Sequence, residues 1–151
     1  MTRVNPDLPN PEAPYDPTHR VTGLFRGHDA VNSALRDLRA AGFAPNDTDV
    51  FAGPAGRQAL APTDETLGLA GRWFLTVEQW VSDTSAFRAL AAATLGAGGF
   101  LVATRVEGGG ERKETAMDIL TRNGASDVKY WSPYFVEQGH EDIPQSPAGP
   151  A

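Results

Sequence analysis

The sequence lacks cysteine, has three histidines and contains no long apolar segment, and each shortage excludes a class of chemistry or location. Without cysteine there are no disulfides, thiolate nucleophiles, iron–sulfur clusters or cysteine-type zinc sites. The longest run without a charged residue, between Arg88 and Arg105, is broken by glycines, whereas a membrane-spanning helix needs about 20 apolar residues. The residues before Arg20 include no apolar stretch of the kind that forms a signal peptide. We therefore expect a cytoplasmic protein without a transmembrane segment.

Basic residues are scarce as well. The 151 residues include 13 Lys or Arg against 19 Asp or Glu, which gives a net charge of −6. Nucleic-acid binding needs a basic surface that neutralises phosphates, so we expect no nucleic-acid partner. The length is that of one domain, long enough to bury a single core.

No group of residues predicts a catalytic centre, a metal site or a cofactor. His28, beside Asp29 in a turn, has no second histidine at helical spacing, and metal sites need several converging ligands. The glycines at 108–110 lack the spacing of a phosphate-binding loop, and no nucleophile motif is present. We therefore predict a protein that is not an enzyme and binds no metal or cofactor.

Both ends of the chain are rich in proline, which fixes φ and donates no backbone hydrogen bond. We predict an extended N-terminal arm over residues 1–19 and a similar C-terminal tail over residues 138–151. Between them lies a single domain, residues 20–137, with a helical insertion at about 54–97. We expect the arms to lie on a partner.

The domain is built from a repeat. Residues 21–52 and 100–132 each read as strand, helix and strand. An offset of 82 positions aligns Ala34 with Ala116, Leu38 with Leu120 and Gly42 with Gly124. Two such units predict an α+β fold, a ferredoxin-like sandwich with four antiparallel strands in the order 4-1-3-2. A looser, helix-rich α+β fold is the alternative.

The insertion between the two halves reads as helical. Thr63 is expected to cap a helix whose apolar positions continue to Val81. A second helix is expected at about 84–95. Its inward positions are predicted at Phe87, Leu90, Ala91 and Leu95.

Three stretches carry a family resemblance: LRAAGF at 38–43, GGFLVATRV at 98–106 and AMDILTRNGASDV at 116–128. With the alanine- and glycine-rich segment between the halves, they resemble the bacterial heat-induced general stress proteins over about residues 20–132. The resemblance implies a ferredoxin-like domain with a stress or accessory role, and it supplies no catalytic residues. Trp73, Trp80 and the proline-rich arms depart from the family and indicate a specialised subunit.

Aromatic residues are the strongest functional signal, because Trp and Tyr anchor interfaces as well as cores. The residues predicted to anchor an interface are Tyr15, Trp73, Trp80, Tyr130, Trp131, Tyr134 and Phe135. We predict a protein-interaction module: a homodimer, or an accessory subunit of a larger assembly, which could be peripheral on a membrane complex. The alternatives are a ligand-sensing domain and a small enzyme, with a pocket between sheet and helices lined by Trp73, Phe74, Trp80, Tyr130 and His28.

Overall fold

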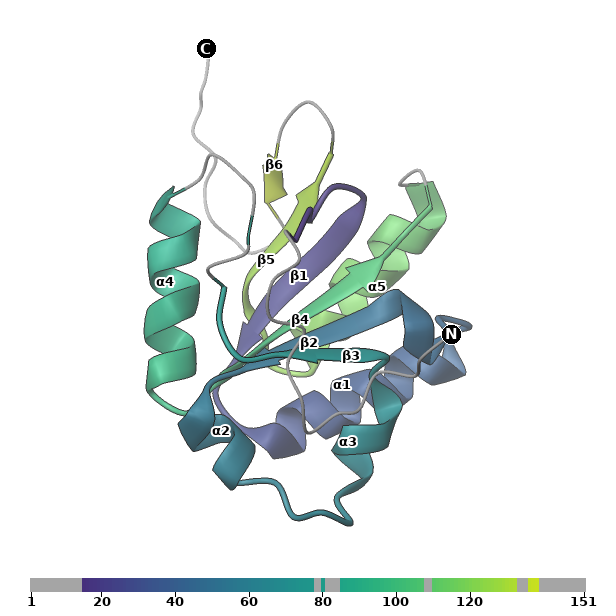
Figure 1. The fold of residues 1–151 in the computed structure, drawn as a ribbon. Coiled ribbons are helices and arrows are strands. Elements are labelled where there is room, and N and C mark those ends of the chain that lie inside the picture. The colour runs from purple at the N-terminus through teal and green to yellow at the C-terminus, as the bar shows by residue number, and fades with distance from the viewer. Residues whose placement is uncertain (1–14, 78–79, 81–84, 108–109, 133–135, 139–151) are drawn as a thin grey trace.

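The computed structural model describes residues 15–77, 80, 85–107, 110–132 and 136–138 (Figure 1). The strands are β1 (Arg20–Phe25), β2 (Thr48–Ala52), β3 (Arg72–Phe74), β4 (Phe100–Arg105), β5 (Ser126–Trp131) and β6 (Val136–Gln138). The helices are α1 (His28–Ala40), α2 (Pro54–Gln58), α3 (Glu65–Leu69), α4 (Ser85–Gly96) and α5 (Gly110–Arg122), with a 3-10 turn at Pro45–Asp47. The expected α+β class is confirmed.

One mixed sheet runs through the domain in the order β3-β2-β4-β1-β5-β6. Strands β2 and β3 are parallel, and every other neighbouring pair is antiparallel. The central pair, β1 and β4, keeps one register from Arg20 opposite Arg105 to Phe25 opposite Phe100. The four strands expected from the two halves of the chain are therefore neighbours, in the order β2-β4-β1-β5.

The two long helices, α1 and α5, end in the same way. Gly42 and Gly124 follow them with φ of 99° and 97°, a left-handed conformation that favours glycine. After each glycine the chain folds back: the Phe43 N–H donates to Leu38 O at 2.9 Å, and the Ala125 N–H donates to Leu120 O at 3.0 Å. The offset of 82 aligns these two glycines. Helix α4 ends in the same way, with Gly98 at a φ of 93° and the Gly99 N–H donating to Thr94 O at 2.8 Å.

Helices α1 and α5 pack on one face of the sheet and form the larger core with it. The strands send alternate residues to this face because successive strand side chains point to opposite sides. The largest buried members are Phe25, Leu35, Leu38, Phe43, Trp73, Phe100, Ile119 and Leu120. Helix α5 approaches β1 closely, because Gly23 offers only backbone there.

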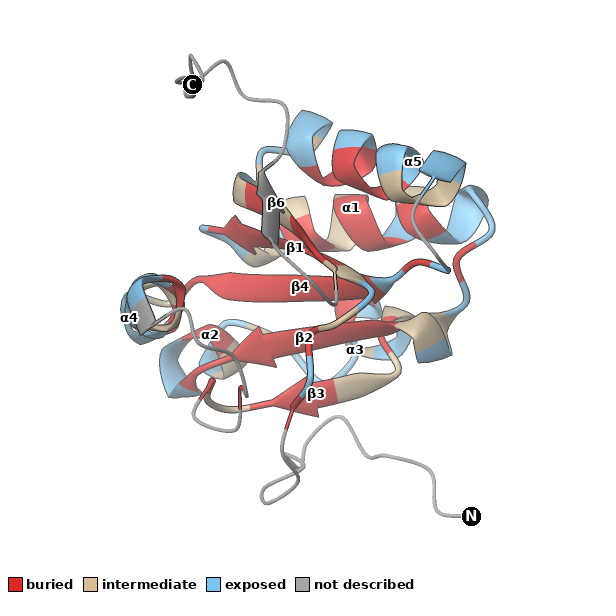
Figure 2. Ribbon diagram, turned by 90° about the horizontal axis from the view of Figure 1, so that it is seen from above, coloured by how far each residue is buried: buried red, intermediate tan, exposed pale blue. Residues whose placement is uncertain are grey.

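The opposite face of the sheet carries a second core, which α4 covers at one side (Figures 1 and 2). Its aromatic rings contact one another in a continuous cluster. The ring centroid of Trp80 lies 5.2 Å from that of Tyr15, 5.4 Å from that of Phe87 and 5.4 Å from that of Trp131. The aromatic members are Tyr15, Phe51, Phe74, Trp80, Phe87 and Trp131.

The inserted segment differs from the sequence prediction in three places. The helix expected from Thr63 to Val81 is wrong: α3 spans Glu65–Leu69, Asp64 caps it by accepting from the Thr66 N–H, and the chain then forms β3. Gly71 permits this turn, since a Cβ there would lie 2.6 Å from Pro45 O. The glycines and prolines between positions 53 and 62 predict a loop, and a short helix, α2, forms there instead. Helix α4 lies where it was predicted, but Leu90 points outward, not inward.

None of the helices in the described part of the chain combines the length and apolar character that crossing a membrane requires.

The close approach at Gly23 gives a test. A Cβ at this position would lie 2.8 Å from Ala125 Cβ and 3.3 Å from Leu120 Cδ1. We expect Gly23→Ala to lower the free energy of unfolding by about 1–3 kcal/mol through overpacking. The matched control is Gly68→Ala in α3, where a Cβ meets nothing within 4 Å; there we expect a gain of about 0.5–1 kcal/mol. Urea unfolding of both variants measures the difference, and equal effects would contradict this packing.

Candidate functional site

The most strongly paired charge in the described structure is the carboxylate of Asp49, which lies in β2 and is 1% exposed. The Tyr15 hydroxyl donates to Asp49 Oδ2 at 2.5 Å, and the Arg72 guanidinium donates to both carboxylate oxygens at 3.0 Å. Arg20 Nε lies 3.5 Å from the same Oδ2. A buried carboxylate is costly unless it is paired and hydrogen-bonded, and here both requirements are met.

This cluster shifts the pKa values of Tyr15 and Arg72. Burial and the neighbouring negative charge of Asp49 raise the pKa of Tyr15 well above its ordinary value, so the phenol remains a hydrogen-bond donor. The hydrogen bonds to Asp49 raise the pKa of Arg72. With its oxygens occupied by Tyr15 and Arg72, Asp49 is suited to holding the segment at Tyr15 against the sheet and not to acid–base catalysis.

The aromatic residues predicted to anchor an interface lie inside the chain. Tyr15, Trp80 and Trp131 belong to the core under α4, and Trp73 and Tyr130 belong to the core under α1 and α5. All five are at most 7% exposed. Tyr134 and Phe135 lie outside the described residues. The five described side chains therefore serve the two cores and present no aromatic edge to solvent.

The pocket considered as an alternative is not formed by the residues expected to line it. Trp73 and Tyr130 lie on one face of the sheet, whereas Phe74 and Trp80 lie on the other. His28 lies near two carboxylates instead, with Nε2 3.2 Å from Asp64 Oδ2 and 3.4 Å from Asp29 Oδ1. Among the described residues, no three potential ligands gather into a metal site.

The surface with the clearest capacity for binding is the outer side of α4. Phe87, Ala91 and Leu95 repeat every four residues and turn toward the sheet. Seen end-on in Figure 2, the helix is buried toward the sheet and exposed on its outer side. From Ala86 to Ala97 the exposed residues are all small or apolar: Ala86, Ala89, Leu90, Ala92, Ala93, Gly96 and Ala97. We call these seven residues the α4 face.

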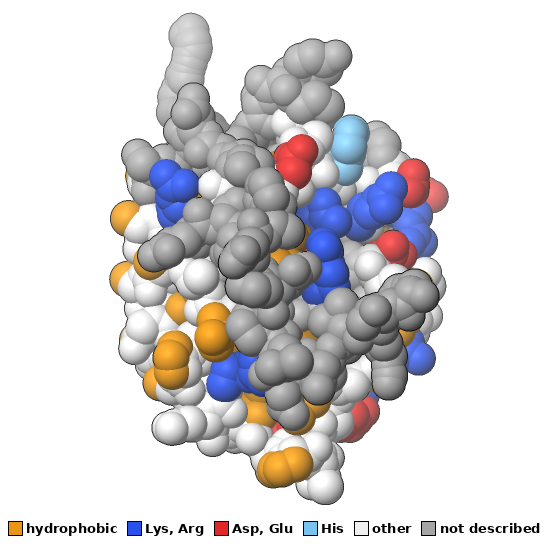
Figure 3. Space-filling view, in the orientation of Figure 1, with side chains coloured by type: hydrophobic (Ala, Val, Ile, Leu, Met, Phe, Trp, Pro, Cys, Tyr) orange, Lys and Arg blue, Asp and Glu red, His pale blue; other side chains and the backbone are white. Residues whose placement is uncertain are grey.

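Leu90 is the prominent member of the α4 face. It is 46% exposed and is the single large hydrophobic residue exposed among those that the structure describes. The polar neighbours are hydrogen-bonded to backbone carbonyls: the Arg88 guanidinium donates to Trp80 O at 3.1 Å, and the Thr94 hydroxyl donates to Leu90 O at 2.9 Å. Hydrophobic side chains gather at the left of the molecule in Figure 3, where α4 lies.

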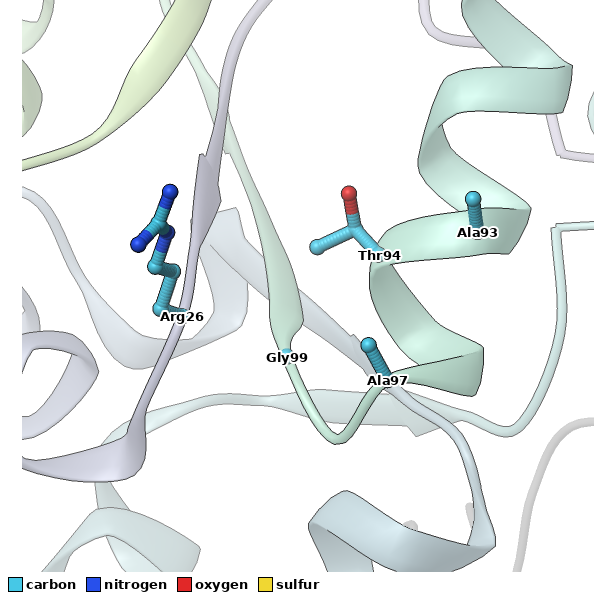
Figure 4. A pocket seen from close by; sticks show the side chains of 5 residues that line it. All are labelled: Arg26, Ala93, Thr94, Ala97 and Gly99. Atoms are coloured by element: carbon cyan, nitrogen blue, oxygen red, sulfur yellow. The ribbon is translucent and has the colours of Figure 1, made fainter.

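Two hollows lined by described residues flank α4. A pocket of about 490 Å³ lies on one side; Arg26 and Thr94 stand on its opposite walls, with Gly99 between them (Figure 4). A smaller pocket of about 200 Å³ lies on the other side, toward the start of α2. The first is lined by Arg26, Ala93, Thr94, Ala97 and Gly99, and the second by Gly53, Pro54, Leu75, Thr76, Val77, Ala92, Leu95 and Gly96. The α4 face is thus an apolar ridge between two grooves.

The sequence contained a signal for this surface. No acidic or basic residue occurs between Arg88 and Arg105, although a surface helix ordinarily carries charge on its outer side. The sequence predicts a short helix, a glycine turn and a buried strand over this run, with Leu90 among the inward residues of the helix. Its helical part is only half buried, and that mismatch identifies the α4 face.

Comparison with protein-family models, with curated proteins and with solved structures finds no match to this chain. The likeness to heat-induced general stress proteins therefore stays a prediction from the residues alone.

The Tyr15–Asp49 pair predicts a specific response to alkali. Because the pKa of Tyr15 is higher in the folded chain, its contribution to stability is complete below the unfolded-state pKa of about 10 and is lost as the pH rises toward the folded-state value. We expect Tyr15→Phe to lower the free energy of unfolding by about 1–3 kcal/mol at pH 8. Above about pH 10 the wild type begins to lose this contribution, so the difference in stability between the two proteins should narrow as the pH rises further.

Urea unfolding at both pH values measures this effect. Tyr130→Phe is the control, since it removes a phenol hydroxyl from the other core. This variant should lose stability in alkali as the wild type does. A Tyr15→Phe variant whose stability falls in alkali as steeply as that of the wild type would contradict the assignment.

Proposed function

We propose first that the domain is ferredoxin-like and arose from two strand–helix–strand halves. The order β2-β4-β1-β5 of the central strands supports this proposal. So does the placement of α1 and α5 on one face of the sheet. The segment between the halves adds β3 to one edge of the sheet and places α4 over the open face.

We propose that the protein is a non-catalytic protein-binding module and that the α4 face is its contact surface. The observation that carries the proposal is the uncharged outer side of α4, with Leu90 exposed between two grooves. Exposed apolar surface beside hollows is typical of helix-in-groove recognition, in which an apolar helix of one protein lies against another. The expected partner surface is therefore an apolar helix.

A role as an accessory or stabilising subunit follows from this contact. A stress-type role, as the resemblance implies, and a cytoplasmic location belong to the same proposal. A membrane complex remains one candidate assembly, to which the chain would attach peripherally. Fold alone does not choose among these roles, because unrelated functions share such folds.

A small-molecule site in the larger pocket is the second candidate. Its volume of about 490 Å³ falls within the range of ligand pockets, and Arg26 would favour an anionic group. Besides Arg26, Thr94 is the only lining residue with a polar side chain, and its hydroxyl already donates to Leu90 O. A specific ligand site usually has several converging polar groups, so we rank this function second.

Site-specific photo-cross-linking in the source cells tests the protein-binding role. A benzoyl-phenylalanine placed at position 90 should give covalent adducts with one or a few proteins, because the ridge is in contact with a partner. The same group at Ala40, an exposed alanine at the end of α1, is the matched control and should give few adducts or none. Absence of protein adducts from position 90 would overturn the proposal and favour the small-molecule alternative.

A further inference from the structure

The α4 face is complementary to itself, and we propose that its partner is a second copy of this chain, docked through α4 across a twofold axis. This inference rests on the proposed protein-binding function and names its partner. It needs no covalent step and no residue outside the described structure.

Helix α4 provides both the projecting side chain and the pocket that would receive it. Leu90 and Ala97 are seven residues apart, nearly two turns, so they stand on the same side of α4. Ala97 lines the larger pocket, which lies on that side. A twofold axis that crosses α4 at right angles near Ala93 and Thr94 places two α4 helices antiparallel. Each Leu90 then lies over the pocket beside Ala97 of the other copy.

Small side chains allow the two helices to approach closely. Ala89, Ala93 and Ala97 repeat every four residues along α4 and are all exposed. With no side chain longer than a methyl group at these positions, the two backbones can come near enough for Leu90 to reach the opposing groove. The antiparallel arrangement also places the positive end of each helix dipole beside the negative end of the other.

The absence of charged residues from the α4 face allows two copies to meet there despite the net charge that each carries. Each chain carries a net charge of −6, so two copies repel unless they meet where acidic groups are absent. The α4 face is such a place, since the run between Arg88 and Arg105 has no charged residue. A surface that selects a charged partner would instead present complementary charges. Arg26, at the far wall of the larger pocket, is the one cation among the residues that line either hollow.

The area buried between two α4 helices would be small, so the association is expected to be weak. A helix of 12 residues is about 18 Å long. A strip of that length buries less than the roughly 800 Å² per partner of a standard interface. We therefore expect a reversible dimer with a dissociation constant on the order of 100 µM.

The absence of cysteine makes disulfide trapping a direct test, because an introduced thiol is unique. Ala93→Cys places one thiol from each copy beside the axis, where Cα atoms can reach the roughly 4.4–6.8 Å that a disulfide needs. Under mild oxidation of the purified full chain, it should form covalent dimer about tenfold faster or more than Ala40→Cys on α1, because association raises the local thiol concentration. Adding Leu90→Glu to Ala93→Cys should reduce the rate to that of the control.

Sedimentation equilibrium provides the reversible measurement. The wild type and Ala40→Glu should both approach twice the monomer mass at high concentration, and Leu90→Glu should remain monomeric with an unchanged circular-dichroism spectrum. A wild type that stays monomeric well above about 100 µM, or an Ala93→Cys rate equal to that of Ala40→Cys, would overturn self-association. If self-association fails, cross-linked adducts between position 90 and a different protein would still support the proposed protein-binding function. If no adducts form either, both the self-association and the protein-binding function are contradicted.

Discussion

The buried carboxylate of Asp49 is the constraint on which the open face of the sheet depends. It joins three segments that are distant in the sequence: β2, the edge strand β3 through Arg72, and the segment at Tyr15. A buried charge that loses a partner is strongly destabilising, so these segments are held in one arrangement. The rings of Tyr15 and Trp80 then complete the aromatic cluster over β2.

Much of the fold can be predicted from the pattern of residues within short stretches of the sequence. Helices α1 and α5 were predictable from apolar spacing and a terminal glycine, and α4 was predictable from its apolar run. Strand β3 was not predictable from local pattern, because Trp73 and Phe74 also fit the spacing of a helix. Their strand conformation depends on parallel pairing with β2 and on the contact of Gly71 with the turn at Pro45. The pairing of Asp49 with Tyr15 was unpredictable for the same reason, since it joins residues 34 positions apart.

The apolar surface that the structure exposes lies at other residues than the aromatic ones predicted to anchor an interface. The Trp and Tyr residues suggested an exposed aromatic edge. A sheet with apolar residues on both faces needs two cores, however, and Tyr15, Trp80 and Trp131 are buried in the second core. The exposed apolar surface instead falls on alanines and Leu90 of α4. Helix propensity does not indicate whether such a helix face is exposed to solvent or buried in the core, because alanine is suited to both environments.

The edges of the sheet bear on how the protein behaves at high concentration. The described sheet begins with β3 and finishes with β6, and each is only three residues long. Long exposed edge strands act as templates for polymerisation and amyloid, and very short ones are a common protection against both. Because both edge strands of the described sheet are this short, copies of the chain at high concentration have little strand edge through which their sheets could join.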